Sequence, residues 1–338
     1  MHRPFHWLAL CSAFSCVAVV GCGAPDLSAM KPTVQKSSAE VLVVGNPPGW
    51  TADAVQTLES ASGLNVQVKF CTSGQLEQEV AQAIRSTGVG LVMVASADLP
   101  DNAFATMVQQ HPQVMFEWLS TAGNRQLGNL ANFRQRVPDE AITGYGTGWL
   151  AGTLESAGWT TSAPVVGWLS GPSGVPASAE QATLGGLYAA APNVQLQAVN
   201  ASAPSQSASG PVPPIVITNH VLSAAEASTL SAARAVLLSL VPQPGVSGIS
   251  TQPAMPDVQA AVEDLLAFAN HTWKPGVVSA TPDQLLQVST GVLSPQVQSS
   301  WQGMASSLAN NAINVTTAWS NVPSPIRTAW SAVAGLAT

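Results

Sequence analysis

Short apolar runs alternate with amphipathic stretches along most of this chain. Apolar runs at 41–44, 66–70, 91–94 and 114–119 are typical of buried strands, and stretches with helical spacing at 51–62, 75–86 and 101–110 separate them. Strands that alternate with helices of this length need crossover connections, which place the strands parallel in one sheet. The alternation therefore predicts an α/β fold.

A second series of the same kind begins near residue 139. It predicts helices at 139–157, 177–190, 223–234, 256–270 and 295–308, and strands at 165–169, 194–199, 215–218, 236–241, 246–249, 277–279 and 285–288. The polar stretch 121–137 between the series carries Arg125, Arg134 and Arg136 and lacks a strong strand pattern, so we expect a crossing there. The two series therefore predict two Rossmann-like lobes with parallel sheets. The tail 311–338 predicts one or two short helices that lie on these lobes.

These patterns divide the chain into segments. We expect a signal peptide at 1–21, a flexible tether at 22–39 and a bilobed domain at 40–310. Lobe one is expected to take about 40–120 and 245–290, and lobe two about 125–240 and 290–310. The Ser- and Pro-rich stretch 201–214 predicts an exposed loop.

The N-terminus has the pattern of an export signal. His2 and Arg3 precede an apolar segment that ends in the residues VVGC at 19–22. This string resembles the bacterial lipobox, whose cysteine is acylated and becomes the new N-terminus. The resemblance implies lipidation at Cys22 and an extracytoplasmic protein anchored to the membrane; the alternative is a plain secretory signal. Cys71 would then stand alone, and a buried apolar role fits it best.

The composition excludes several classes of protein. Charged residues make up only 9% of the chain and the net charge is −7, whereas a nucleic-acid binder needs a basic face. After the signal, no apolar run is long enough to predict an internal membrane span. Partners are therefore sought among small molecules and proteins.

Several local strings resemble the basic membrane protein (PnrA-like) family. These are HPQVMF at 111–116, GYGTGWLAG at 144–152, VVGWL at 165–169, GGLY at 185–188 followed by PNV at 192–194, and WKPG at 273–276. VSTGVLSPQV at 288–297 is closest to the Med-type branch, lipoproteins described as competence regulators. The family implies a type I periplasmic-binding fold related to purine-nucleoside receptors of ABC importers.

The resemblance also locates a nucleoside site and shows what it lacks. In the loop after the first strand, Asn46 and Trp50 are the candidates for amide and stacking contacts, but the family's acid is missing. The acid that binds the ribose hydroxyls should follow the strand at 236–241, and residues 239–243 contain none. Unpaired hydroxyls cost about 1–3 kcal/mol each, so we expect poor binding of purine nucleosides.

Further ligand candidates follow predicted strands. Ser96, Ser170, Asn219 and His220 stand at carboxyl ends, where open parallel sheets bind ligands. Solvated loop residues and turn caps are the alternative explanation for each.

Enzyme motifs are weak throughout. Neither a nucleophile elbow nor metal-ligand spacing is present, so we expect no catalytic residue, no metal and no cofactor. The carboxylates Asp257, Glu263 and Asp264 are expected on a solvated helix face, and the glycines of 146–151 in close helix packing. Two function classes stay open: a solute-binding lipoprotein that serves an ABC permease, and a Med-type regulatory lipoprotein with a protein partner.

Overall fold

The computed structural model describes residues 38–336 apart from 48–49, 62, 97–99, 121–126, 160–163, 173–174, 201–210, 244–245, 255–257, 280–285 and 290–292. The predicted signal peptide, Cys22, nearly all of the tether, Asp257 and most of the 201–214 loop lie outside this part. Within it, no helix combines the length and the apolar character needed to cross a membrane.

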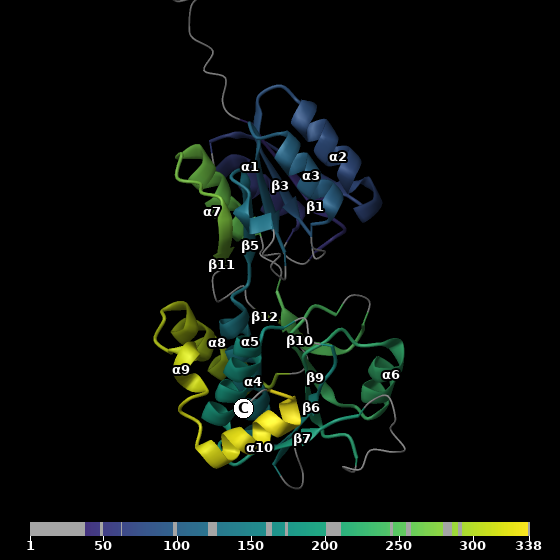
Figure 1. Cartoon of the computed structure of the whole chain (residues 1–338), viewed down its shortest axis with the longest axis vertical. Coiled ribbons are helices and arrows are strands. Elements are labelled where there is room, and N and C mark those ends of the chain that lie inside the picture. The colour runs from purple at the N-terminus through teal and green to yellow at the C-terminus, as the bar shows by residue number, and fades with distance from the viewer. Residues whose placement is uncertain are drawn as a thin grey trace, which may run out of the picture. The chain divides into compact units, whose positions relative to one another are not determined.

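The first sheet is six-stranded and entirely parallel (Figure 1). Its order is β11-β5-β4-β3-β1-β2, with β1 Ser38–Val44, β2 Asn65–Cys71, β3 Val89–Ala95, β4 Met115–Leu119, β5 Phe133–Val137 and β11 Gly276–Ser279. Two helices pack on each face: α1 (Ala52–Ala61) with α7 (Val258–Ala269), and α2 (Ser73–Arg85) with α3 (Asn102–Gln110). The sheet and these helices form lobe one.

The second sheet has the order β12-β10-β9-β8-β6-β7. Its strands are β6 Val165–Leu169, β7 Gln195–Ala198, β8 Ile215–Thr218, β9 Val236–Ser239, β10 Ile249–Pro253 and β12 Leu286–Val288. All pairs are parallel except β10 with β12. Its helices are α4 Glu140–Leu154, α5 Ala177–Ala190, α6 Ala224–Ala232, α8 Pro295–Ala309, α9 Val315–Ala318 and α10 Ser324–Ala334. Together they form lobe two, and the two-lobed α/β prediction is confirmed.

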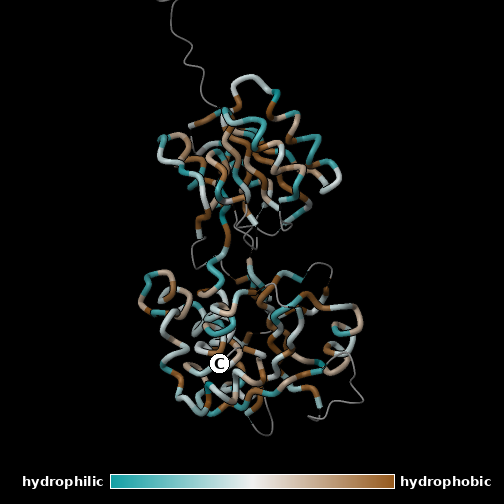
Figure 2. The backbone as a smooth tube through the Cα atoms, viewed as in Figure 1, coloured by the Kyte–Doolittle hydropathy of each residue, from teal (hydrophilic) through white to brown (hydrophobic). Residues whose placement is uncertain are grey.

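Apolar strands explain why each sheet forms a core. In Figure 2 the hydrophobic colouring is concentrated in the strands of the first sheet, while the helices over it carry mixed colouring. Residues 39–43 of β1 are all buried, as is required of a central strand covered on both faces.

Glycine allows unusually close packing of α4 on α5. Gly144, Gly148 and Gly152 recur every fourth residue and so lie on one face of α4. A Cβ added at Gly148 would overlap the backbone of Thr183, and one at Gly186 would overlap the backbone of Tyr145. The expectation of close helix packing for 146–151 is confirmed.

The C-terminal tail belongs to lobe two. Trp330 of α10 is buried in the lobe-two core, with its ring 6.3 Å from that of Tyr188. The short helix α9 packs on α5, where Gly185 contacts Ala318. The predicted short helices are therefore present, and they cover the core.

Two expectations about the lobes are wrong. Residues 133–137 form β5, a buried strand between β4 and β11, where a polar crossing was expected. Strands β10 and β12 belong to the second sheet, although 245–290 was assigned to lobe one. The sheets accordingly take residues from 38–137 and 276–279, and from 165–253 and 286–288. The first error arose because paired arginines make β5 look like a solvated segment.

Candidate functional site

A buried charge cluster ties β4 and β5 to α7. Asp264, expected to be solvated, is completely buried and accepts hydrogen bonds from both Arg134 and Arg136, the latter at 2.7 Å between Nε and Oδ2. Arg136 also pairs with Glu263, which is 41% exposed. The solvated-face expectation is wrong for Asp264, because the partners that justify its burial lie far away in sequence.

Glu117 completes this cluster. Its carboxylate lies 3.2 Å from Nε of Arg134 and accepts a hydrogen bond from the indole of Trp273 at 2.9 Å. Burial and the negative charge of Asp264 raise the pKa of Glu117 well above its ordinary value, although Arg134 and Trp273 oppose the shift. Every group of the cluster faces another member, so the arrangement stabilises lobe one and is not a binding site.

The carboxyl edge of the second sheet gathers three residues predicted to bind ligand. Asn219 and His220 follow β8 and are buried, while Ser170 follows β6 and is exposed. Asn219 donates to Glu180 at 2.6 Å and accepts from the backbone of Gly171 at 3.1 Å. These residues lie at the carboxyl ends of their strands, as their positions in the sequence predicted, but Asn219 is committed to protein partners.

His220 is similarly engaged. Its Nδ1 lies 3.2 Å from the hydroxyl of Thr218, and its Nε2 lies 3.3 Å from a carboxylate oxygen of Glu226. The ring packs against Gly171, where an added Cβ would overlap it. Burial disfavours the charged form of Glu226 and by itself would raise its pKa. Hydrogen bonds from Ser223 and His220 outweigh this effect and lower the pKa. The network fixes the loops at this edge.

One polar group at this edge has no partner in the described part of the chain. The hydroxyl of Thr143 in α4 is buried without a hydrogen bond and lines a cavity of about 30 Å³. Leu240, Val241 and Pro242 form the opposite wall, at the position where the family resemblance places a ribose-binding acid. The cavity has room for roughly one water molecule.

The carboxyl edge of the first sheet holds the other candidates. Asn46 is exposed in the loop after β1, and Ser96 is buried directly after β3. Trp50 is only 2% exposed and packs with Val43, Leu58 and other core residues. Its ring packs against these core residues, so the structure assigns Trp50 to packing.

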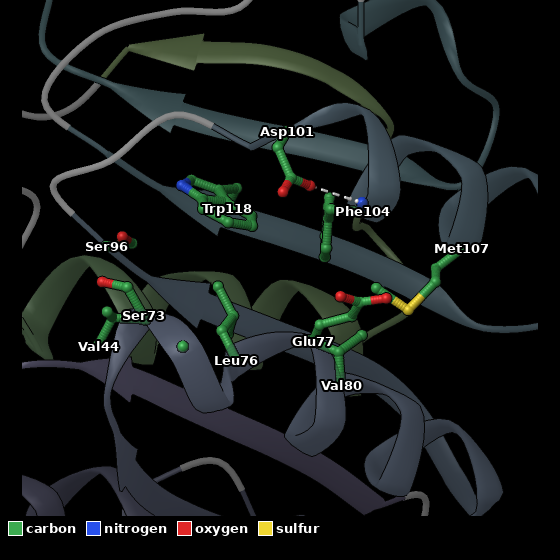
Figure 3. A pocket seen from close by; sticks show the side chains of 11 residues that line it. Val44, Ser73, Leu76, Glu77, Val80, Ser96, Asp101, Phe104, Met107 and Trp118 are labelled. Atoms are coloured by element: carbon green, nitrogen blue, oxygen red, sulfur yellow. Dashed lines mark hydrogen bonds between the residues drawn. The ribbon is translucent and has the colours of Figure 1, made fainter.

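A cavity of about 280 Å³ opens between α2 and α3 (Figure 3). Ser96 lines it, together with residues from the ends of β1 and β4 and the first turns of both helices. Its lining residues are Val44, Ser73, Gly74, Leu76, Glu77, Val80, Ser96, Asp101, Phe104, Met107 and Trp118. Its volume is far greater than that of the cavity beside Thr143.

Sequence reasoning identified only Ser96 among these lining residues as a ligand candidate. Asp101 was identified only as the start of a helix, which is correct: its Oδ1 accepts a hydrogen bond from the backbone N–H of Phe104 at 2.8 Å. Trp118 lies inside an apolar strand, where an aromatic residue gives no sign of lining a cavity. No cluster of three or more potential metal ligands occurs among the described residues.

Comparison with known proteins identifies the fold. No family model matches the chain, and no curated protein matches it. A solute-binding protein of an ABC transporter system from Conexibacter woesei superposes with a TM-score of 0.52 at 14% identity, covering 82% of this chain and 97% of that one. The chain has the type I periplasmic-binding fold of ABC transporter solute-binding proteins.

Two other solved structures are similar at lower scores. A transcriptional activator of the comK gene from Bacillus halodurans has a TM-score of 0.48 at 15% identity, covering 82% of this chain and 99% of that one. A solute-binding protein from Aeropyrum pernix has a TM-score of 0.46 at 14% identity, covering 88% and 91%. At such identities the likeness concerns the fold alone.

Proposed function

We propose that the protein is an extracytoplasmic solute-binding lipoprotein of the basic membrane protein type, which presents a small molecule to an ABC permease. The observation that carries the proposal is the placement of polar side chains and cavities at the carboxyl edges of two parallel sheets. Open α/β sheets bind ligands at this edge. Asn46 and Ser96 in lobe one and the exposed Ser170 in lobe two are the proposed contacts, while Asn219 and His220 are proposed to position the loop beside Ser170 through their bonds to Glu180 and Glu226. The protein performs no catalysis in this role.

The ligand is proposed not to be a purine nucleoside. The segment that should supply a ribose-binding acid is Leu240–Pro242, which lines a cavity with room for water only. Trp50 is packed in the core, so the stacking contact is also lost. Base stacking is worth about 1–3 kcal/mol, whereas even a millimolar dissociation constant needs about 4 kcal/mol. Neither contact is available to reach that value.

A thermal-shift screen of the full chain tests this function. Nucleosides, bases, sugars and amino acids are added separately, and a ligand that binds only the folded state must raise the melting temperature. We expect a shift from a compound other than adenosine, guanosine or inosine, reduced in Asn46→Ala or Ser96→Ala. A micromolar affinity for any of the three nucleosides would overturn the exclusion, and no shift from any compound would contradict the transport role.

Membrane anchoring through Cys22 is part of the proposal. It is supported by the string VVGC at 19–22. The variant Cys22→Ala should appear in the soluble fraction or remain unprocessed, while Cys71→Ala, which changes the buried cysteine of β2, should stay in the membrane fraction. A Cys22→Ala protein that is trimmed normally and stays membrane-bound would show that the anchor lies elsewhere.

A regulatory role with a protein partner is the second candidate. The observation that favours it is the closed network at the lobe-two edge, where Asn219 and His220 bind Glu180 and Glu226. Such a network leaves few groups for a solute. A permease and an ATPase encoded beside this chain would favour transport, and an isolated gene would favour regulation.

A further inference from the structure

The cavity between α2 and α3 combines an apolar wall with an acidic rim. Phe104 and Trp118 form an aromatic corner, with ring centroids 4.7 Å apart and planes at 73°. Leu76, Val80 and Met107 extend the apolar wall. Figure 3 shows the carboxylates of Asp101 and Glu77 on opposite sides of the Phe104 ring, one from each helix. An occupant must therefore satisfy both apolar and negatively charged surroundings.

The charges at this cavity have one sign. Among the described residues, Glu77 and Asp101 are its charged lining residues and no basic side chain lines it. Lys69, on the neighbouring strand β2, is paired with Glu40 and Glu79. The N-termini of α2 and α3 each supply about half a positive charge, which offsets roughly one of the two carboxylates. The rim keeps about one net negative charge and selects a cation.

Asp101 is held in place for such a contact. One oxygen caps α3 through the N–H of Phe104, and the second oxygen has no hydrogen bond within the described residues. The cap fixes the carboxylate beside the aromatic corner, where a cation is also attracted to the ring faces. Recognition then needs no rearrangement of this side chain.

We propose that this cavity is a binding site for a small organic ammonium ion with an apolar body. At the liquid density of water its volume of about 280 Å³ corresponds to roughly nine water molecules, which is the size of an arylalkylamine with a two-carbon chain. The ammonium group pairs with the free oxygen of Asp101, the charge of Glu77 adds to the negative potential of the rim, and the apolar body lies against Phe104 and Trp118. The site lies within lobe one and shares Ser96 with the proposed solute contacts, but binding of an amine there requires no permease.

A set of ligands that differ only in charge tests the proposal by isothermal titration calorimetry on the full chain in detergent. Phenethylamine is the cation, 2-phenylethanol is its neutral counterpart and phenylacetate is the anion. We expect phenethylamine to bind at least tenfold more tightly than the alcohol and phenylacetate to bind most weakly. Equal binding of the amine and the alcohol, tighter binding of phenylacetate, or absence of binding by all three would overturn the proposal.

A double variant and a matched control test whether binding occurs in this cavity. Asp101→Asn with Glu77→Gln removes the charge while Asn still caps the helix, so affinity for phenethylamine should fall at least tenfold with little change in melting temperature. Glu59→Gln, on α1 over the opposite face of the sheet, is the matched control and should bind normally. Unchanged affinity in the double variant would overturn the proposal.

Gly74→Leu gives an independent check on location. Gly74 lines the cavity, and an added Cβ meets no atom within 4 Å. Leucine is also a better helix former than glycine, so the variant should fold and lose phenethylamine binding. Binding that survives in Gly74→Leu would place the amine elsewhere. A negative screen with positive amine binding would refute a role as receptor for nucleosides, bases, sugars or amino acids and leave the amine site standing.

Discussion

The two lobes share one fold but stabilise their buried polar groups differently. In lobe one, ion pairs join Arg134 and Arg136 of β5 to Asp264, with the Glu117 carboxyl group 3.2 Å from Arg134, and an acidic cavity stays open between α2 and α3. In lobe two, hydrogen bonds from amide, imidazole and backbone groups, several of them to the carboxylates of Glu180 and Glu226, close the sheet edge around Asn219, and glycines bring α4 and α5 together. The same edge of the same fold is thus open in one lobe and largely filled in the other.

The largest effect is expected from breaking the ion pairs of lobe one. Asp264→Ala leaves two buried guanidinium groups with fewer partners, and removing one member of a buried ion pair costs about 3–5 kcal/mol. Glu263→Ala, at the neighbouring exposed position, should cost about 1 kcal/mol or less. Chemical denaturation measures both. Equal costs would show that the burial of Asp264 contributes nothing beyond an ordinary surface pair.

The next largest loss of stability is expected from disturbing the close packing of α4 on α5 in lobe two. Gly148→Ala forces α4 away from α5, because the added Cβ would overlap the backbone of Thr183. Overpacking a core costs about 1–3 kcal/mol. Gly303→Ala in α8 is the matched control: its Cβ meets no atom within 4 Å, and alanine favours the helix by up to about 1 kcal/mol. Hydrogen exchange should localise the Gly148→Ala loss to lobe two, and increased exchange confined to lobe one would contradict this origin.

The lobes also differ in how much of them the sequence predicts. Apolar runs located almost every strand, but β5 was missed because its residues 134–136 are all polar. The carboxylate that makes burial of Arg134 possible lies 130 positions away, and no local pattern shows such a pairing.

The candidate site residues were likewise predicted where a local pattern marks them and missed where it does not. The expectation that ligands bind at the carboxyl ends of parallel strands located Ser96 and Asn219, because parallel strands share one carboxyl edge. It did not find Asp101 and Trp118, whose local roles as helix cap and strand residue hide their place beside a cavity. It also could not distinguish an open edge from one closed by internal hydrogen bonds, since that depends on side-chain partners from α5 and α6.

The two lobes are also expected to depend on pH in opposite directions. Glu117 has a pKa raised above 4.5 by burial, so the folded state favours its neutral form. Its contribution to stability is complete below 4.5 and is lost as the pH rises through the folded pKa. Glu226 has a lowered pKa, so its contribution is present above 4.5 and is lost as the pH falls through the folded value. Acidic conditions therefore favour lobe one and weaken lobe two through these groups.

Two amide variants separate these contributions. Glu117→Gln imitates the neutral acid and should remove the loss of lobe-one stability at rising pH. Glu226→Gln keeps a residue suited to the capping box of α6, and should remove the loss of lobe-two stability at falling pH, with an effect of about 1 kcal/mol or less. Peptide-resolved hydrogen exchange between pH 3 and 8 follows each lobe separately, after correction for the pH dependence of intrinsic exchange. Each replacement preserves the shape of the side chain and removes one ionisable group. If the stability of both lobes changes with pH in the same direction, and neither variant alters these profiles, then other groups control the pH dependence of both lobes.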